Sequence, residues 1–261
     1  MIGQLVARAP RVERNGFRRR GLEVGRLEAL SDAVFGFAIT LLVVSLEVPA
    51  TFGELLNTLR GLPAFAASFA LLFLVWLNQY RFFRRYGLED AVTILLNAIL
   101  LFVILFFVYP LKFVFQLVVG IALGPQWVPG SGRAGVVIVG PGQGPVMMMV
   151  FGAGYVAVFL IFTLLNAHAY RLRDALELNE VERFETRDNL REALLNTAIG
   201  VLSITIAVVG GSRHTALAGM AYWLVGPAMM VNGFITGAAR ARLHARLAAQ
   251  QPPSPSPASA A

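Results

Sequence analysis

Long apolar stretches alternate with short polar segments along most of the 261-residue chain. A helix that crosses a bilayer needs about 20 mainly apolar residues. Six stretches meet this requirement, over residues 31–48, 62–80, 91–109, 146–169, 193–209 and 215–237. The pattern therefore predicts an all-α integral membrane protein with six transmembrane helices per subunit.

Three segments between these spans interrupt the simple pattern. Residues 111–123 stay apolar after Pro110, and we expect a short external or re-entrant helix there. Residues 137–144 are rich in glycine and proline, which favours a turn-rich external loop. Residues 171–191 mix both charge signs at helical spacing, which predicts that the fourth span continues as a solvated cytoplasmic helix.

The basic residues are distributed unevenly between the two sides of the predicted bundle. With six spans, 18 of the 22 lie in the N-terminal segment, the loops after the second and fourth spans, and the C-terminal segment. The opposite side holds Arg60, Lys112, Arg133 and Arg213. Cytoplasmic segments carry the excess of Lys and Arg, so we expect both termini in the cytoplasm.

This pattern divides the chain into three parts. Residues 1–25 are basic and lack the apolar run of a secretory signal, which predicts a flexible cytoplasmic tail. Residues 26–240 form the six-helix transmembrane domain. Residues 241–261 are first basic and then rich in Pro, Ser and Ala, a composition typical of a disordered tail.

Composition narrows the function classes. The chain is 57% hydrophobic and 14% charged, whereas soluble domains carry about 25% charged residues. It has no cysteine and only three scattered histidines, which argues against a metal site. The net charge of +7 comes from arginines at the ends of apolar segments, so we expect a lipid bilayer and no nucleic acid as partner. No catalytic set of Ser, His and Asp is present, so we expect no enzyme.

The first span has a polar entrance formed by Arg26, Ser31 and Asp32. Charged groups are costly in lipid and face protein or water, which favours a functional site. Ser31 and Asp32 also stand where side chains cap the start of a helix, and the residue types leave these two explanations equal. Asparagines inside later spans predict hydrogen bonds between helices: Asn166, Asn196 and Asn232.

The body of the first span carries one continuous apolar stripe. Phe37, Leu41, Val44 and Val48 recur at helical spacing, with Thr40 beside them. Such a stripe ordinarily packs against lipid or a neighbouring helix. If it lines a central path instead, it forms stacked hydrophobic rings that gate by dewetting.

The stretch "RLEALSDAVFGFAITLLVVSLEVP" (residues 26–49) resembles the first helix of the transmembrane protein 175 family of potassium channels. The stretches "SFALLFLVWLNQYRFFRR" (residues 68–85) and "LNAILLFVILFFVYP" (residues 96–110) are similar to the second and third helices of that family. The resemblance covers residues 26–110. It implies a bacterial-type member with a single six-helix repeat, in the inner membrane, assembled as a homotetramer.

The resemblance also implies roles for individual residues. The first helix of each subunit would line a potassium-selective pore, constricted by rings of Phe37, Leu41 and Val44, with Thr40 associated with selectivity. A structural motif would hold this helix behind the pore: Arg26, Leu30, Ser31, Asp32, Trp76 and Asn97. No cofactor is implied, only permeant potassium ions.

The sequence departs from the family pattern at several positions. Leu30 and Phe37 stand where phenylalanine and isoleucine are expected, and Gln79 and Tyr80 replace paired histidines. Asp32 leaves a proton-coupled secondary transporter open as one alternative, and the resemblance leaves a proton-permeable leak channel open as another. A third alternative is a non-conducting assembly module in which the polar residues only join helices.

Overall fold

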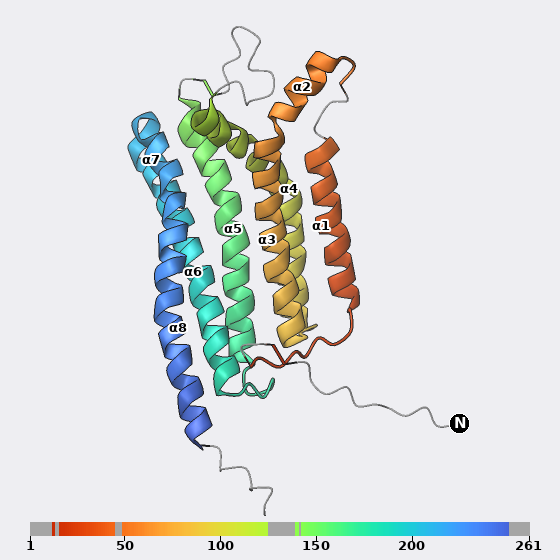
Figure 1. The fold of residues 1–261 in the computed structure, drawn as a ribbon, viewed down its shortest axis with the longest axis vertical. Helices are drawn as coiled ribbons and strands as arrows, with labels where there is room; N and C mark the ends of the chain where they lie inside the picture. Colours follow the sequence, from red (N-terminus) through yellow and green to blue (C-terminus); the bar gives the residue numbers. More distant parts are fainter. Residues whose placement is uncertain (1–11, 14–15, 45–48, 125–138, 141, 251–261) are drawn as a thin grey trace, which may run out of the picture.

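The computed structural model describes residues 12–13, 16–44, 49–124, 139–140 and 142–250. They form a bundle of long helices (Figure 1), namely α1 (Arg26–Val44), α3 (Leu62–Tyr86), α4 (Ala91–Leu123), α5 (Gln143–Arg171), α6 (Glu180–Gly210) and α8 (Val225–Gln250). Shorter elements are α2 (Phe52–Arg60), α7 (Thr215–Met220) and the 3-10 turns η2 (Gly211–His214) and η3 (Ala221–Leu224). Helix α1 packs on α3 and α4, whereas α8 packs on α6, at the opposite edge of the bundle in Figure 1.

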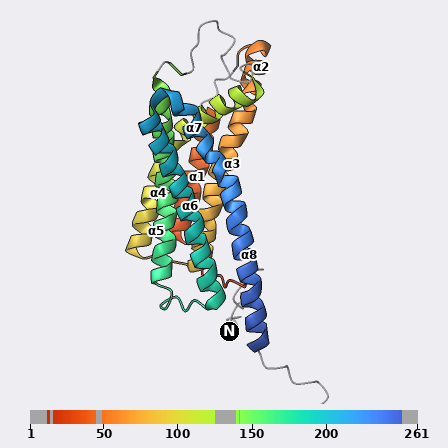
Figure 2. The ribbon, with the colours of Figure 1, turned by 90° about the vertical axis from the view of Figure 1, so that its left-hand side faces the viewer.

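The all-helical prediction is confirmed. Five helical segments are long and apolar enough to cross a membrane, and the last of them runs from Glu180 to Leu247. This last segment reverses at Gly211, which has a positive φ of 56°. As a result α6 and α8 lie side by side and run in opposite directions (Figures 1 and 2). Residues 45–48, the end of the first predicted span, lie outside the described residues.

Residues 111–123 do not form a separate helix. They continue α4 through Pro110, and the last turns of α4 bend away from the first part near the top of Figure 1. A proline inside a helix removes one backbone hydrogen bond and kinks the axis. Apolar residues on both sides of Pro110 keep the helix going, so the proline bends it without ending it.

The charged segment 171–191 extends the fifth span and not the fourth, contrary to the prediction. Helix α5 ends at Arg171, and α6 begins at Glu180 behind a capping box in which Asn179 and Glu182 bond to each other's backbone N–H groups. Such a box satisfies two free donors and fixes the start of a helix. The charged residues therefore form the first turns of α6.

The start of α4 is fixed by Asp90, which lies in the loop before the helix. Its carboxylate accepts hydrogen bonds from Val92 N (3.2 Å) and Thr93 Oγ1 (2.6 Å), and lies 2.8 Å from His168 Nε2 of α5. Partial burial raises the pKa of Asp90, but the hydrogen bonds from Thr93 and His168 outweigh it and lower the pKa overall. The ionised carboxylate also suits the positive end of the helix dipole.

The segment before α1 is not a flexible tail over residues 16–25, which we call the N-terminal strap. Phe17 is fully buried and packs edge-to-face on Tyr86. Arg18 Nε and Arg20 Nη2 donate to the two carboxylate oxygens of Glu182, at 3.0 and 2.9 Å. The strap therefore ties the start of α1 to the end of α3 and the start of α6.

The C-terminal boundary also differs from the predicted one. Helix α8 continues to Gln250, ten residues beyond the boundary at 240, and its last turns project past the other helices (Figure 2). The Pro/Ser/Ala-rich residues 251–261 lie outside the described residues.

Candidate pore helix and its polar clamp

One face of α1 is buried against the neighbouring helices. Ser31, Phe35, Ala38 and Leu42 follow each other at helical spacing and are at most 2% exposed. The three apolar ones belong to a core that α3 and α4 share. Burial of apolar surface is worth about 25 cal/mol per Å². This face therefore fixes the rotation of α1.

A chain of buried hydrogen bonds crosses from α1 to α4 and on to α3. Asn97 Nδ2 donates to Ser31 Oγ at 2.9 Å, and Gln79 Nε2 donates to Asn97 Oδ1 at 3.0 Å. All three side chains are fully buried. A buried polar group without a partner costs about 1–3 kcal/mol. Sliding one helix along another would break these hydrogen bonds, so they favour a single register of the three helices. We call these three residues the amide clamp.

Asp32 makes a separate contact at the edge of α1. Its Oδ1 accepts a hydrogen bond from Trp76 Nε1 of α3 at 2.7 Å. The alternative that Ser31 and Asp32 cap the start of the helix is wrong, because α1 already begins at Arg26. Ser31 Oγ instead donates back to Leu27 O at 2.7 Å.

Of the predicted motif, Ser31, Asp32, Trp76 and Asn97 come together. Arg26 does not join them: it is exposed, and within the described part of the chain it makes no hydrogen bond or ion pair. Leu30 is also 56% exposed.

The first turn of α1 is held by a pair that the sequence interpretation missed. Glu28 is 5% exposed and its carboxylate lies 3.1 Å from Arg84 Nε of α3. An acidic residue one turn before Asp32 was the available signal. Its partner was not evident because Arg84 stands among several arginines at the end of α3.

The face of α1 opposite the clamp is exposed. Phe37 is 57% and Val44 is 75% exposed. Thr40 lies between them, and its hydroxyl donates to Phe37 O at 2.7 Å. Leu41 differs, since it is half-buried against the core. Two residues of the predicted stripe, Phe37 and Val44, thus share the open face with the neighbouring Thr40. Leu41 lies at its edge, and Val48 lies outside the described residues.

The asparagines of the later spans differ in their hydrogen bonds: two bond to a neighbouring helix and one bonds within its own helix. Tyr155 Oη donates to Asn196 Oδ1 at 2.7 Å, and Asn232 Nδ2 donates to Asp188 Oδ1 at 3.0 Å, so these two asparagines join helices. Asn166 instead bonds within its own helix, to Phe162 O. Among the described residues, no group of three His, Asp or Glu side chains is placed to hold a metal ion.

Comparison with known proteins finds similarity to potassium channels over most of the chain. A family model described as the endosomal/lysosomal potassium channel TMEM175 matches residues 26–107. A potassium channel of Marivirga tractuosa is 39% identical over 230 residues, which cover 87% of this chain and 93% of that protein. A potassium channel of Chamaesiphon minutus is 38% identical over 96 residues, which cover 34% of this chain and 47% of that protein.

The fold also matches a solved structure. The crystal structure of a threonine-to-alanine variant of the potassium channel MtTMEM175, in complex with a nanobody fusion protein, superposes with a TM-score of 0.76 at 38% identity. The match covers 87% of this chain and all of that chain. Identity at this level over nearly the whole length shows that this chain belongs to the TMEM175 family of potassium channels.

Proposed function

We propose that this chain is one subunit of a homotetrameric, potassium-selective channel in a bacterial inner membrane, with six membrane crossings and both termini in the cytoplasm. The names of its near-full-length relatives support potassium as the permeant ion. The reversal at Gly211 supports a crossing each for α6 and α8. The loops at the lower end of Figure 1 carry the predicted excess of arginine, which supports the orientation.

The observation that carries the proposal is the contrast between the two faces of α1. One face is locked by the amide clamp and the buried apolar residues, and the other presents Phe37, Thr40 and Val44 as exposed side chains. In a tetramer with α1 at the axis, Phe37 and Val44 form stacked apolar rings. Leu41, which lies at the edge of the open face, forms the ring between them, with Thr40 adjacent to it.

Apolar rings of this kind control conduction through hydration. An ion passes where water passes, and a ring too narrow to stay wet is closed. Thr40 adds one polar feature. Because its hydroxyl hydrogen is used within the helix, its oxygen lone pairs are available to a partly dehydrated cation. No bound cofactor is required, and the partners are other copies of the chain and the bilayer.

The direct test is a potassium flux from liposomes that contain the purified tetramer. We expect a flux that persists when the proton gradient is removed. A flux that needs a proton gradient would identify the proton-coupled transporter, with Asp32 as the candidate carrier. A verified tetramer without any flux would identify a non-conducting module and contradict the proposal.

The constriction is tested by Phe37→Ala. Removing the phenyl groups widens the ring, so single-channel conductance should rise several-fold. Phe73→Ala is the matched control, because Phe73 of α3 is 43% exposed and lies outside the proposed pore. Equal currents in the wild type and Phe37→Ala would mean that Phe37 does not line the path.

A further inference from the structure

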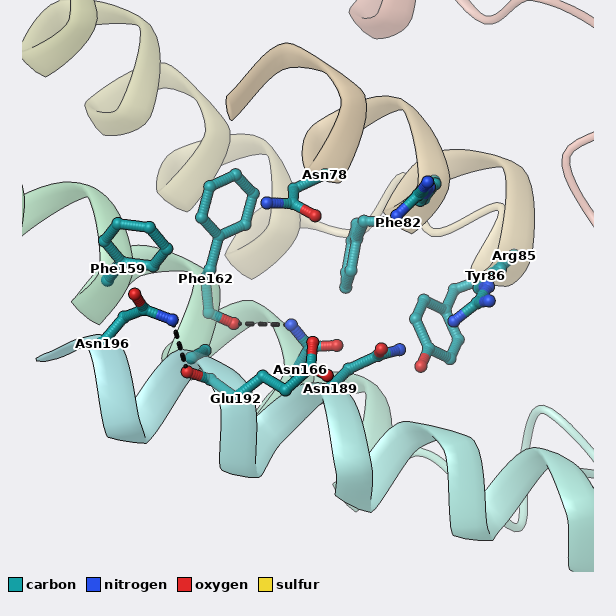
Figure 3. Close-up of a pocket in the computed structure, with 12 residues that line it drawn as sticks. Asn78, Phe82, Arg85, Tyr86, Phe159, Phe162, Asn166, Asn189, Glu192 and Asn196 are labelled. Atoms are coloured by element: carbon teal, nitrogen blue, oxygen red, sulfur yellow. Dashed lines mark hydrogen bonds between the residues drawn. The ribbon is translucent and has the colours of Figure 1, made fainter. Parts of the chain in front are cut away.

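A polar cavity of about 130 Å³ lies between α3 and α6, near the end of the bundle that the N-terminal strap covers. In Figure 3 the side chains of Phe159, Phe162 and Asn166 from α5 lie between these two helices and complete the lining. The hydrogen bond between Tyr86 Oη and Thr186 Oγ1, at 2.8 Å, joins α3 and α6 beside it. A volume of this size holds about four water molecules, or a small polar headgroup.

The α3 wall of the cavity supplies hydrogen-bond donors and positive charge. Asn78, Arg81 and Arg85 follow one face of the helix. Arg85 is already committed, because its Nε and Nη2 donate to Glu13 Oε2 at 3.2 and 2.9 Å. Arg81 is exposed and makes no hydrogen bond or ion pair within the described part of the chain. Its guanidinium is therefore available to an anion.

The opposite wall supplies acceptors and negative charge. Glu192 and Asn189 of α6 line it. Between the two walls, Asn166 uses its amide N–H on Phe162 O, which leaves its carbonyl oxygen as an acceptor toward the cavity. Figure 3 shows the polar ends of Asn78 and Asn166 directed into the space between the helices. The cavity thus has a cationic wall and an anionic wall with amides between them.

The cavity also adjoins apolar surface. Leu74 lies one helical turn before Asn78 on α3 and is 54% exposed. Polar groups thus follow an exposed apolar side chain along a single helix face, near the level where the arginines mark the end of the span. A ligand that matches this order has an apolar tail and a small headgroup with both charges.

We propose that this cavity binds the headgroup of a phospholipid whose phosphate carries a primary ammonium group, as in phosphatidylethanolamine. The phosphate binds Arg81, since guanidinium groups bind phosphate by paired, charge-assisted hydrogen bonds. The ammonium donates to Glu192 and the amide oxygens. A choline headgroup has no N–H to donate, and a glycerol headgroup has no cation, so both bind more weakly.

Binding to the detergent-purified full chain tests the proposal, with short-chain phosphatidylethanolamine, phosphatidylcholine and phosphatidylglycerol as probes. Free phosphoethanolamine and inorganic phosphate are probed in parallel. We expect the ethanolamine lipid to bind at least about tenfold more tightly than the choline lipid, the ratio expected for a charge-assisted hydrogen bond. Arg81→Gln should weaken all three lipids by about tenfold. Glu192→Gln should weaken the ethanolamine lipid most and the choline lipid less, and it should not weaken the glycerol lipid, which has no cation.

The controls are Arg60→Gln on α2 and Glu180→Gln at the start of α6, which change exposed charges away from the cavity and should leave all affinities unchanged. Equal affinity for the ethanolamine and choline lipids, or no effect of Arg81→Gln in a protein of unchanged melting temperature, would overturn the proposal. Free phosphoethanolamine binding as tightly as the lipid would overturn the lipid as its source. Because the readout is binding, these outcomes do not depend on whether the chain conducts potassium.

Discussion

Helices α1 and α8 occupy opposite edges of the bundle and are attached to it in different ways. Both expose large apolar side chains, such as Phe37 on α1 and Phe234 on α8, which is 73% exposed. Beneath α1, however, lie buried apolar residues such as Phe35 and Leu42. Among the described residues of α8, the buried ones are Asn232 and Thr236, both polar.

The polar contacts of the two helices differ in charge. The amide clamp of α1 consists of neutral groups. Helix α8 is held by Arg240, whose Nε lies 2.6 Å from Glu185 Oε1 and whose Nη2 lies 3.7 Å from Asp188 Oδ2. The rotation of α1 is therefore set mainly by packing and neutral hydrogen bonds, with one ion pair, Glu28–Arg84, at its first turn, whereas the position of α8 depends on charge.

The largest expected effect comes from breaking the α8 attachment with Arg240→Gln. The change removes the cation that pairs with Glu185 and Asp188, both buried, and removing one partner of a buried pair costs about 3 kcal/mol or more. Amide hydrogen exchange should rise along α8 and stay unchanged along α1. Arg242→Gln, an exposed arginine on the same helix, is the control. A matching rise along α1 would show that the two attachments are not independent.

The next largest effect is expected for the amide clamp itself. Asn97→Ala removes both hydrogen bonds of the clamp and leaves Ser31 and Gln79 buried with lost partners, at a cost of about 2–3 kcal/mol. Exchange should now rise along α1 and not along α8, and the melting temperature should fall. Asn57→Ala on α2, where Asn57 has no hydrogen bond within the described part of the chain, should change neither. A stable Asn97→Ala protein would show that apolar burial alone sets the rotation of α1.

The sequence predicts the helical class and most span positions because twenty apolar residues in a row have few other stable states. It misplaces the charged segment because alternating charges at helical spacing do not indicate which neighbouring helix they join. The signal at Asn179 and Glu182 was present, since a capping box marks a helix start. The reversal at Gly211 falls between the fifth and sixth predicted spans, where the sequence analysis placed a loop.

The candidate site is predictable only in part. Ser31 and Asp32 stand out because polar residues in lipid need partners, and the exposed stripe follows from periodicity. The partners themselves depend on the register between distant helices, which no local pattern contains. For this reason the sequence did not reveal that Gln79 completes the clamp or that Glu28 pairs with Arg84.

A smaller effect is expected when the two faces of α1 are compared by removing one hydroxyl group from each. Ser31 and Thr40 each donate to a carbonyl of their own helix, but Ser31 is buried in the clamp and Thr40 is exposed. Ser31→Ala should lower the free energy of unfolding by about 1–2 kcal/mol, since it leaves the Asn97 amide without an acceptor. Thr40→Ala should change it by less than about 0.5 kcal/mol but reduce the ratio of potassium to sodium flux. Equal stability losses would contradict the assignment of two distinct faces.

The smallest effect needs no substitution, only salt. Raising the ionic strength from about 0.1 to 1 M shortens the screening length from about 10 to 3 Å. Arg240 has a side chain that is 37% exposed, so its ion pairs should weaken by at most about 1 kcal/mol, the range of solvent-exposed pairs. Hydrogen exchange along α8 should then rise by up to about fivefold, while exchange along α1, which is held mainly by the neutral amide clamp and apolar contact, stays constant, or becomes slower when the salt is a sulfate, since sulfate strengthens apolar burial. If α1 loosens together with α8, its rotation depends on the Glu28–Arg84 pair more than on the amide clamp, and the two edges of the bundle differ less than their burial indicates.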